Sequence, residues 1–112
     1  MHVEPTDPLR DLIRSTLAFY ERFGVTPKLE AATLVFSEEV DEFIEAAHDA
    51  ESIDHIAEEA ADVLVTVIGL CDAAGVSQDV LIEQIYAVIR KNDAKTWDTH
   101  EINAEGKIAR KV

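Results

Sequence analysis

The sequence predicts an all-α protein, a four-helix bundle that assembles as a homo-oligomer. Three observations favour this fold class. Apolar residues recur at every third or fourth position through four successive segments, which is the spacing of one helix face. Short stretches with Gly, Pro or a capping Ser or Asp separate these segments. No stretch shows the alternation of apolar and polar residues that is typical of a half-buried strand.

The four predicted helices span residues 8–23, 28–49, 53–74 and 78–94. Asp7 suits the N-cap of the first helix, with Pro8 at its first position, and Gly24 suits its end. Ser52 and Ser77 are expected to cap the third and fourth helices. The first, third and fourth helices therefore have a capping residue that agrees with their apolar spacing.

The chain is expected to form a single domain over residues 1–112. Its 112 residues, 47% of them hydrophobic, suffice for one modest core. Residues 1–6 are expected to form a loose lead, the helical core to span about 8–95, and residues 98–112 to form an extended tail.

The third predicted helix has more apolar surface than one small bundle buries. Val63, Val65, Ile68 and Leu70 extend its apolar stripe around nearly the whole circumference. Symmetric helix packing between copies would cover the excess. We therefore expect a homodimer or a homotetramer.

Composition excludes several classes of function. A formal charge of -13 argues against binding to nucleic acid or to an anionic membrane. The longest apolar run, residues 63–71, is too short to span a bilayer, and residues 1–11 lack the layout of a signal peptide. The single cysteine, Cys71, lies in an apolar helical run and suits a reducing compartment. A cytoplasmic location is expected.

Acidic residues gather at two places in the predicted helices. Glu39 and Glu42, and likewise Glu59 and Asp62, are three residues apart and so project from one side of a helix. On antiparallel helices the four carboxylates would meet, and each would disfavour ionisation of the others unless a cation were bound. Two interpretations stay open: separate solvated faces, or a site for Mg²⁺ (Mn²⁺ possible), which prefers oxygen ligands. Glu59 and Asp62 favour the second because they interrupt an otherwise apolar helix.

The acidic motif resembles that of the all-α nucleoside triphosphate pyrophosphohydrolases, the MazG-like proteins. It reads Glu38-Glu39-x-x-Glu42, a gap of sixteen residues, then Glu59-x-x-Asp62. Relatives of these proteins include dimeric dUTPases and phosphoribosyl-ATP pyrophosphohydrolases. The similarity continues through "VIRKNDAK" to "EGKIARK", and so covers nearly the whole chain.

This resemblance implies roles for particular residues. It implies Mg²⁺ ligands at Glu39, Glu42, Glu59 and Asp62, and a metal or water-activating role for Glu38, so that Glu38 and Glu39 are the candidate catalytic residues. It implies contacts with the nucleotide and its phosphates at Asn92 and Lys95, and Lys91 and Lys107 are further candidates for the outer phosphates. The alternative for Lys91 and Lys95 is a favourable position at the negative end of a helix dipole, and for Asn92 a helix cap.

The base-contacting side of the pocket is less well defined. Relatives often carry an aromatic residue shortly after the aspartate, where this chain has residues 63–66, Val-Leu-Val-Thr. Trp97, Phe19 and Phe23 are aromatic residues that could stack on a base, but core packing is the expected role of each.

The implied activity is Mg²⁺-dependent hydrolysis of a (deoxy)nucleoside triphosphate to the monophosphate and pyrophosphate, in cleansing the nucleotide pool. The chemistry agrees with the residues, because triphosphate hydrolysis needs negative charge neutralised in the transition state and a carboxylate to take a proton from water. One alternative is a phosphoribosyl-ATP pyrophosphohydrolase of histidine biosynthesis. Another is a non-catalytic helical oligomerisation module whose acids lie on the surface.

Overall fold

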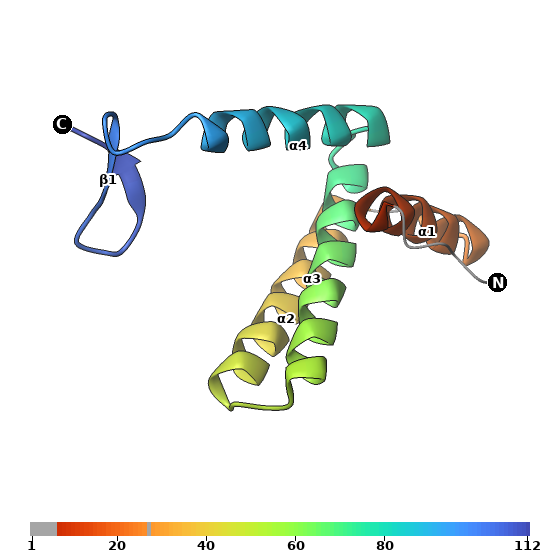
Figure 1. Ribbon diagram of the computed structural model, residues 1–112. Helices are drawn as coiled ribbons and strands as arrows, with labels where there is room; N and C mark the ends of the chain where they lie inside the picture. Colours follow the sequence, from red (N-terminus) through yellow and green to blue (C-terminus); the bar gives the residue numbers. More distant parts are fainter. Residues whose placement is uncertain (1–6, 27) are drawn as a thin grey trace. The chain divides into compact units, whose positions relative to one another are not determined.

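The computed structural model describes residues 7–26 and 28–112. These residues form α1 (Pro8–Arg22), α2 (Leu29–His48), α3 (Ile53–Ala73), α4 (Gln78–Asp93), β1 (His100–Ile102) and β2 (Ile108–Arg110) (Figure 1). The predicted all-α class and its four helices are confirmed, and each helix begins and ends within one residue of its predicted bounds. The expected loose lead, residues 1–6, lies outside the described residues.

The chain divides into two compact units, one of residues up to Gln78 and one of Asp79–Val112. The first contains α1, α2 and α3, and the second contains nearly all of α4 and the two strands. The expectation of one domain over residues 1–112 stays a prediction.

Side chains at the helix starts act as the sequence predicts. Asp7 caps α1, its Oδ1 accepting a hydrogen bond of 3.1 Å from the backbone N–H of Arg10. Ser52 caps α3, its Oγ accepting one of 3.2 Å from the backbone N–H of His55. Each cap satisfies a backbone donor that has no partner within its helix. The cap at Ser77 stays a prediction.

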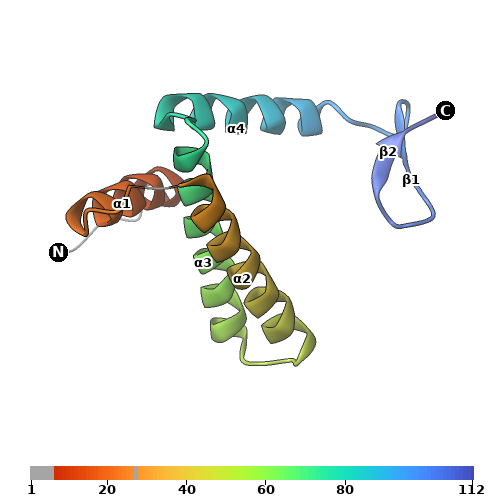
Figure 2. The ribbon, with the colours of Figure 1, turned by 180° about the vertical axis from the view of Figure 1, so that it is seen from behind.

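In the first unit, α2 and α3 lie side by side and antiparallel, joined by a four-residue connection (Figures 1 and 2). The helix α1 packs against α3. Among the described residues, three apolar side chains are fully buried, namely Ile13 of α1, Ala46 of α2 and Ile68 of α3. The core is therefore thin, and the α2–α3 pair is the main packed contact of this unit.

A glycine sets how closely α1 approaches α3. A Cβ atom at Gly69 would overlap the hydroxyl oxygen of Tyr20 and would lie 3.2 Å from two of its ring carbons. The absence of a side chain at Gly69 thus leaves room for the Tyr20 ring on the surface of α3.

We expect Gly69→Ala to destabilise the protein, because overpacking costs about 1–3 kcal/mol. The higher helix propensity of Ala offsets up to about 1 kcal/mol of this cost. Tyr20→Phe removes the nearest atom, so Gly69→Ala should cost less in that background than in the wild type. Urea unfolding of the four proteins of this double-mutant cycle measures the coupling. Equal costs of Gly69→Ala in both backgrounds would show that the Tyr20 hydroxyl does not restrict this position.

Residues 98–112, expected as an extended tail without strands, form a β-hairpin instead. The strands β1 and β2 are antiparallel, with Ile102 opposite Ile108. In the turn, the Gly106 N–H donates to the Asn103 carbonyl at 2.9 Å, and Gly106 has φ 84. The Asn103 side chain also accepts from the N–H groups of Glu105 and Lys107. The Asn and Gly residues could have indicated the turn from the sequence. The strands could not be predicted, because three residues are too few to show alternation of apolar and polar side chains.

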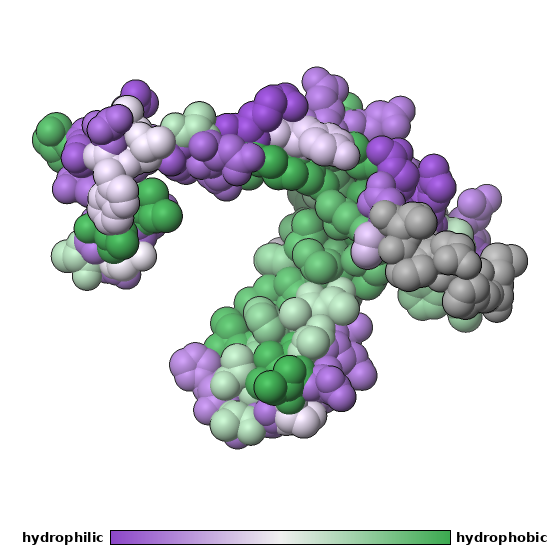
Figure 3. All heavy atoms as spheres, in the orientation of Figure 1, coloured by the Kyte–Doolittle hydropathy of each residue, from purple (hydrophilic) through white to green (hydrophobic). Residues whose placement is uncertain are grey.

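Apolar side chains remain exposed along the α2–α3 pair. Leu34 of α2 is 66% exposed and Leu64 of α3 is 46% exposed, and Figure 3 shows hydrophobic residues gathered over these helices. Contiguous apolar surface of this kind is typical of a protein–protein contact. The homo-oligomer stays a prediction that this surface supports. Among the described residues, no helix has the length and hydropathy that crossing a membrane requires.

We expect the wild type to be at least a dimer at micromolar concentration, as measured by light scattering. Leu64→Glu should shift it toward the monomer, because a charge would be buried between copies. Ile53→Glu is the matched control, since Ile53 begins α3 and is 83% exposed. A wild type that is monomeric at this concentration would contradict the expectation.

Candidate functional site

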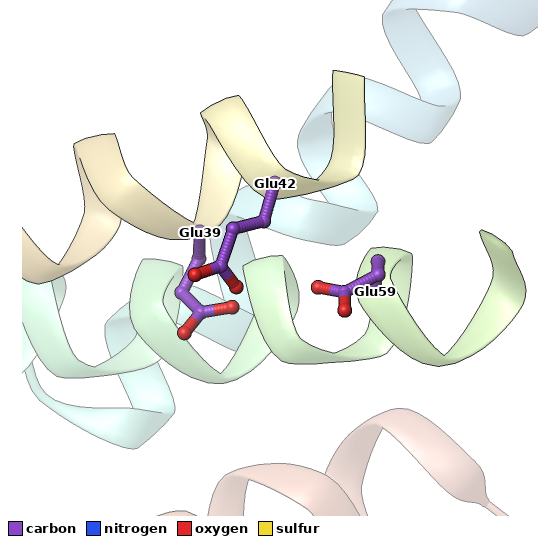
Figure 4. Close-up of side chains that lie close together, drawn as sticks. All are labelled: Glu39, Glu42 and Glu59. Carbon is purple, nitrogen blue, oxygen red and sulfur yellow. The ribbon is translucent and has the colours of Figure 1, made fainter. Parts of the chain in front are cut away.

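The α2–α3 pair brings three carboxylates together. Glu39 and Glu42 of α2 and Glu59 of α3 each offer an oxygen atom, and the three oxygens lie within 4.8 Å of one another. Figure 4 shows the two α2 side chains reaching toward α3, with Glu59 beside them. The spacing of three residues puts Glu39 and Glu42 on one side of α2, and the antiparallel packing supplies Glu59 from the neighbouring helix. We call these three residues the acidic cluster.

Two oxygens of the acidic cluster are buried without a hydrogen-bond partner among the described residues. They are Oε2 of Glu39 and Oε2 of Glu59, and the Glu59 side chain is only 13% exposed. A buried carboxylate oxygen without a partner raises the free energy of the folded state. A hard divalent cation prefers carboxylate oxygens as ligands, so this donor set fits Mg²⁺ or Mn²⁺.

The electrostatics of the acidic cluster agree with its geometry. Burial raises the pKa of Glu39, and the negative charge of Glu42 raises it further, with smaller effects from Asp62 and Glu59. Burial likewise raises the pKa of Glu59, again with Glu42 as the next cause, while His55 opposes the rise. The folded protein thus disfavours the charged forms of both groups when no cation is bound.

His55 was not predicted from the sequence, yet it contacts the acidic cluster. Its Nε2 lies 3.5 Å from Oε1 of Glu59 and 3.3 Å from Oε1 of Glu51. His55 precedes Glu59 by four residues on α3, which is the spacing of side chains that meet on one helix face. It occupies one oxygen of Glu59, while Oε2 is the buried, unpartnered atom. The i, i+4 spacing was the available signal.

The other two acidic residues of the predicted site lie outside the acidic cluster. Asp62 is exposed on α3, but it is close enough to raise the pKa of both Glu39 and Glu59. Glu38 is exposed on α2. The roles of Glu38 in catalysis and of Asp62 in metal binding stay predictions.

A small cavity of about 260 Å³ is lined by residues of α2 and α3, by Tyr20 of α1 and by residues between α1 and α2. Val35 of α2 and Thr66 of α3 line it, each one helical turn from an acid, Glu39 and Asp62 respectively. The Thr66 hydroxyl donates to the Val63 carbonyl at 2.7 Å, as expected for a threonine on a buried helix. The cavity wall is therefore mainly apolar next to the acids.

In the second unit, three of the four predicted substrate-binding residues line one cavity. It has a volume of about 700 Å³, and Asn92, Lys95 and Lys107 contribute to its wall. Lys91 does not line this cavity. Asn92 comes from the end of α4, Lys95 follows that helix, and Lys107 follows the hairpin turn. The hairpin thus carries Lys107 to the residues at the end of α4.

The expectation that three aromatic side chains pack in the core is wrong. Trp97 is 70% exposed and lines the larger cavity. Phe19 of α1 and Phe23, which directly follows that helix, are exposed and contact each other, their ring centroids 5.1 Å apart. Phe19 is exposed because α1 is oriented with Ile13 and Thr16, rather than Phe19, toward the core.

A family model described as phosphoribosyl-ATP pyrophosphohydrolase matches residues 21–92, more than half of the chain. The match includes all three residues of the acidic cluster. Searches of curated proteins and of solved structures gave no match.

We expect the acidic cluster to make the metal-free protein less stable as the pH rises. A carboxyl group with a raised pKa in the folded state stabilises that state at pH values below its unfolded pKa, near 4.5, and this contribution is lost as the pH rises through the folded pKa. Thermal unfolding in EDTA across this range should therefore show a stability difference between wild type and Glu39→Gln that changes with pH. Millimolar Mg²⁺ should stabilise the wild type near neutral pH.

Glu45→Gln, an exposed acid on the same helix, is the control for this experiment. It should show no such pH-dependent difference. A Glu39→Gln profile parallel to the wild type at every pH would contradict the electrostatic account.

Proposed function

This chain belongs to the phosphoribosyl-ATP pyrophosphohydrolase family, within the MazG-like all-α superfamily, and on that premise we propose that it is a Mg²⁺-dependent nucleoside triphosphate pyrophosphohydrolase. The family places it among the hydrolases that act on acid anhydrides. The substrate in our proposal is a (deoxy)nucleoside triphosphate, and the products are the monophosphate and pyrophosphate, in cleansing of the nucleotide pool. The observation that carries the proposal is the pair of buried, unpartnered oxygens on Glu39 and Glu59.

In this proposal Glu39, Glu42 and Glu59 hold the cation, with Asp62 as a fourth ligand. Mg²⁺, or Mn²⁺ in its place, supplies neutralisation of phosphate charge and a lowered pKa for a bound water. The three carboxylates would bind and orient it, and His55, whose Nε2 lies 3.5 Å from Oε1 of Glu59, would hold the Glu59 carboxylate in position.

A carboxylate of the chain removes the proton from the attacking water. Glu38 and Glu39 are the two proposed residues, since each neighbours or belongs to the acidic cluster. The water oxygen forms a bond to the α-phosphorus, and the bond from that phosphorus to the oxygen bridging to the β-phosphorus breaks. Pyrophosphate leaves, and the monophosphate remains.

Residues of the second unit bind the substrate in this proposal. Asn92, Lys95 and Lys107 line the larger cavity, and Lys91 is an additional cation near the end of α4. The ammonium groups would offset the charge of the phosphates. A nucleotide is thus the proposed partner, with neither nucleic acid nor a membrane, and a cytoplasmic location is part of the proposal.

A second function is favoured by the family match itself. Phosphoribosyl-ATP carries the same triphosphate chain, so the acidic cluster would serve its hydrolysis by the same chemistry. A non-catalytic oligomerisation module is the third possibility. The burial of two carboxylate oxygens counts against it, because buried unpartnered carboxylates destabilise the fold and a surface that only joins copies does not require them.

We expect pyrophosphate release to require Mg²⁺ and to fall sharply in Glu59→Gln and Asp62→Asn. Since ligands of one cation act as a unit, the double variant should lose little more than either single one. Glu38→Gln should keep metal binding while turnover falls by about 10²–10⁴-fold if Glu38 is the base. Glu45→Gln is the control and should keep full turnover. Full turnover in Glu59→Gln and Asp62→Asn would remove the enzyme hypothesis.

A substrate panel separates the two enzymatic functions. We expect higher kcat/KM for at least one ribo- or deoxyribonucleoside triphosphate than for phosphoribosyl-ATP, measured as pyrophosphate release with saturating Mg²⁺. Cleavage of phosphoribosyl-ATP alone would establish the second function in place of the first.

A further inference from the structure

We infer that the larger cavity of the second unit binds the nucleobase of the substrate as well as its phosphates, with Trp97 as the stacking surface. This inference rests on the proposed function and extends it to the part of the substrate that the acidic cluster does not contact. The second unit would then hold a nucleotide without any metal ion, by means of its own aromatic and cationic side chains.

The position of Trp97 is the first argument. Trp97 is the single tryptophan of the chain and is 70% exposed, although it lines the cavity. The N–H of Lys95 donates to the Asn92 carbonyl at 3.1 Å and so closes the end of α4 just before it. The N–H of Asp98 donates to the Thr96 hydroxyl at 3.3 Å just after it. Bonds on both sides thus hold the backbone of this segment while the indole stays available.

The hairpin supplies the second apolar part of the cavity. Ile102 and Ile108 are opposite each other in the register of the two strands and both line it. They are 57% and 58% exposed. Three large apolar side chains exposed at one cavity are unusual for a free surface. Apolar walls with a few polar groups are typical of small-molecule sites, and about 700 Å³ is within the usual range of such pockets.

Charge identifies the ligand class. Lys95 follows α4 and Lys107 follows the hairpin turn, while Glu101 is the acidic residue among those that line the cavity. Residues 79–112 contain six acidic and six basic residues, so the whole formal charge of -13 is carried by residues 1–78. A ligand with one flat apolar part and one strongly anionic part fits this wall. A nucleotide has both.

The hairpin turn also fixes the backbone of Lys107, and with it the direction of the Cα–Cβ bond. The Asn103 side chain accepts a hydrogen bond of 2.9 Å from the Lys107 N–H, and the Asn103 N–H donates to the Lys107 carbonyl at 2.8 Å. A backbone held at both of its polar groups limits the region that the ammonium group can reach. The backbone of Lys107 is therefore fixed beside the cavity that this residue lines.

The experiment compares two ligands in EDTA, ATP and inorganic tripolyphosphate, which lacks a base. Binding is measured by calorimetry, and the fluorescence of the single tryptophan is followed in parallel. ATP should quench this fluorescence in a saturable manner. Tripolyphosphate should bind without a comparable quench.

Variants at one residue separate stacking from charge. Trp97→Ala should weaken ATP binding by about 5- to 150-fold, the range that corresponds to stacking of one base, and should leave tripolyphosphate binding unchanged. Trp97→Phe keeps an aromatic ring and should retain most of the ATP affinity. Lys107→Ala should weaken both ligands. Tyr86→Ala is the matched control, because Tyr86 is an exposed aromatic residue of α4 that does not line the cavity.

Two results would overturn the inference. One is unchanged ATP affinity in Trp97→Ala, with or without a change in oligomeric state. The other is an equal loss for ATP and tripolyphosphate, which would indicate a structural role. Failure of the proposed function would give a different result. ATP would bind with the Trp97 dependence described above, but no pyrophosphate would be released at any Mg²⁺ concentration. Pyrophosphate release with an unchanged KM in Trp97→Ala would contradict the inference and leave the function intact.

Discussion

Three carboxylates within 4.8 Å of one another, two of them with a buried and unpartnered oxygen, raise the free energy of the folded state unless a cation or a proton neutralises them. The packing of the first unit is what maintains this arrangement. The short connection between α2 and α3 keeps the two helices antiparallel and in register, so that Glu59 meets Glu39 and Glu42. His55 contacts Oε1 of Glu59. The same contacts that form the thin core thus hold the carboxylates in place.

Charge is distributed unevenly along the chain. Residues 1–78 carry the net negative charge and present carboxylate oxygens, which suit a divalent cation. Residues 79–112 are neutral overall and present lysines beside exposed apolar side chains, which suit a nucleotide. A magnesium nucleotide has both kinds of surface. This correspondence, together with membership of a pyrophosphohydrolase family, is the physical basis of the proposed function.

Much of the fold and part of the site follow from the sequence alone. The helices were predictable because apolar spacing marks all four of them, and the side-chain caps Asp7 and Ser52 mark the starts of α1 and α3. The start of α2 has no side-chain cap and follows from its apolar spacing alone. The meeting of Glu39 and Glu42 with Glu59 was one of two interpretations of the sequence. A spacing of three puts both α2 acids on one side of the helix, but it does not fix whether that side faces α3 or solvent. The hairpin was not, because its strands are too short for a pattern. The exposure of Trp97 was not, because hydrophobicity alone does not distinguish a core residue from a ligand surface.

The central claim is that the acidic cluster binds one divalent cation, and direct titration with Mn²⁺ followed by electron paramagnetic resonance tests it. We predict saturable binding of Mn²⁺ that Mg²⁺ competes away. The affinity should fall by at least about 10-fold in Glu39→Gln and in Glu59→Gln, since loss of a hydrogen-bond partner of a metal ligand already weakens metal binding by that factor. Glu45→Gln should bind as the wild type does. Absence of saturable binding, or equal affinity in the wild type and both cluster variants, would contradict the account.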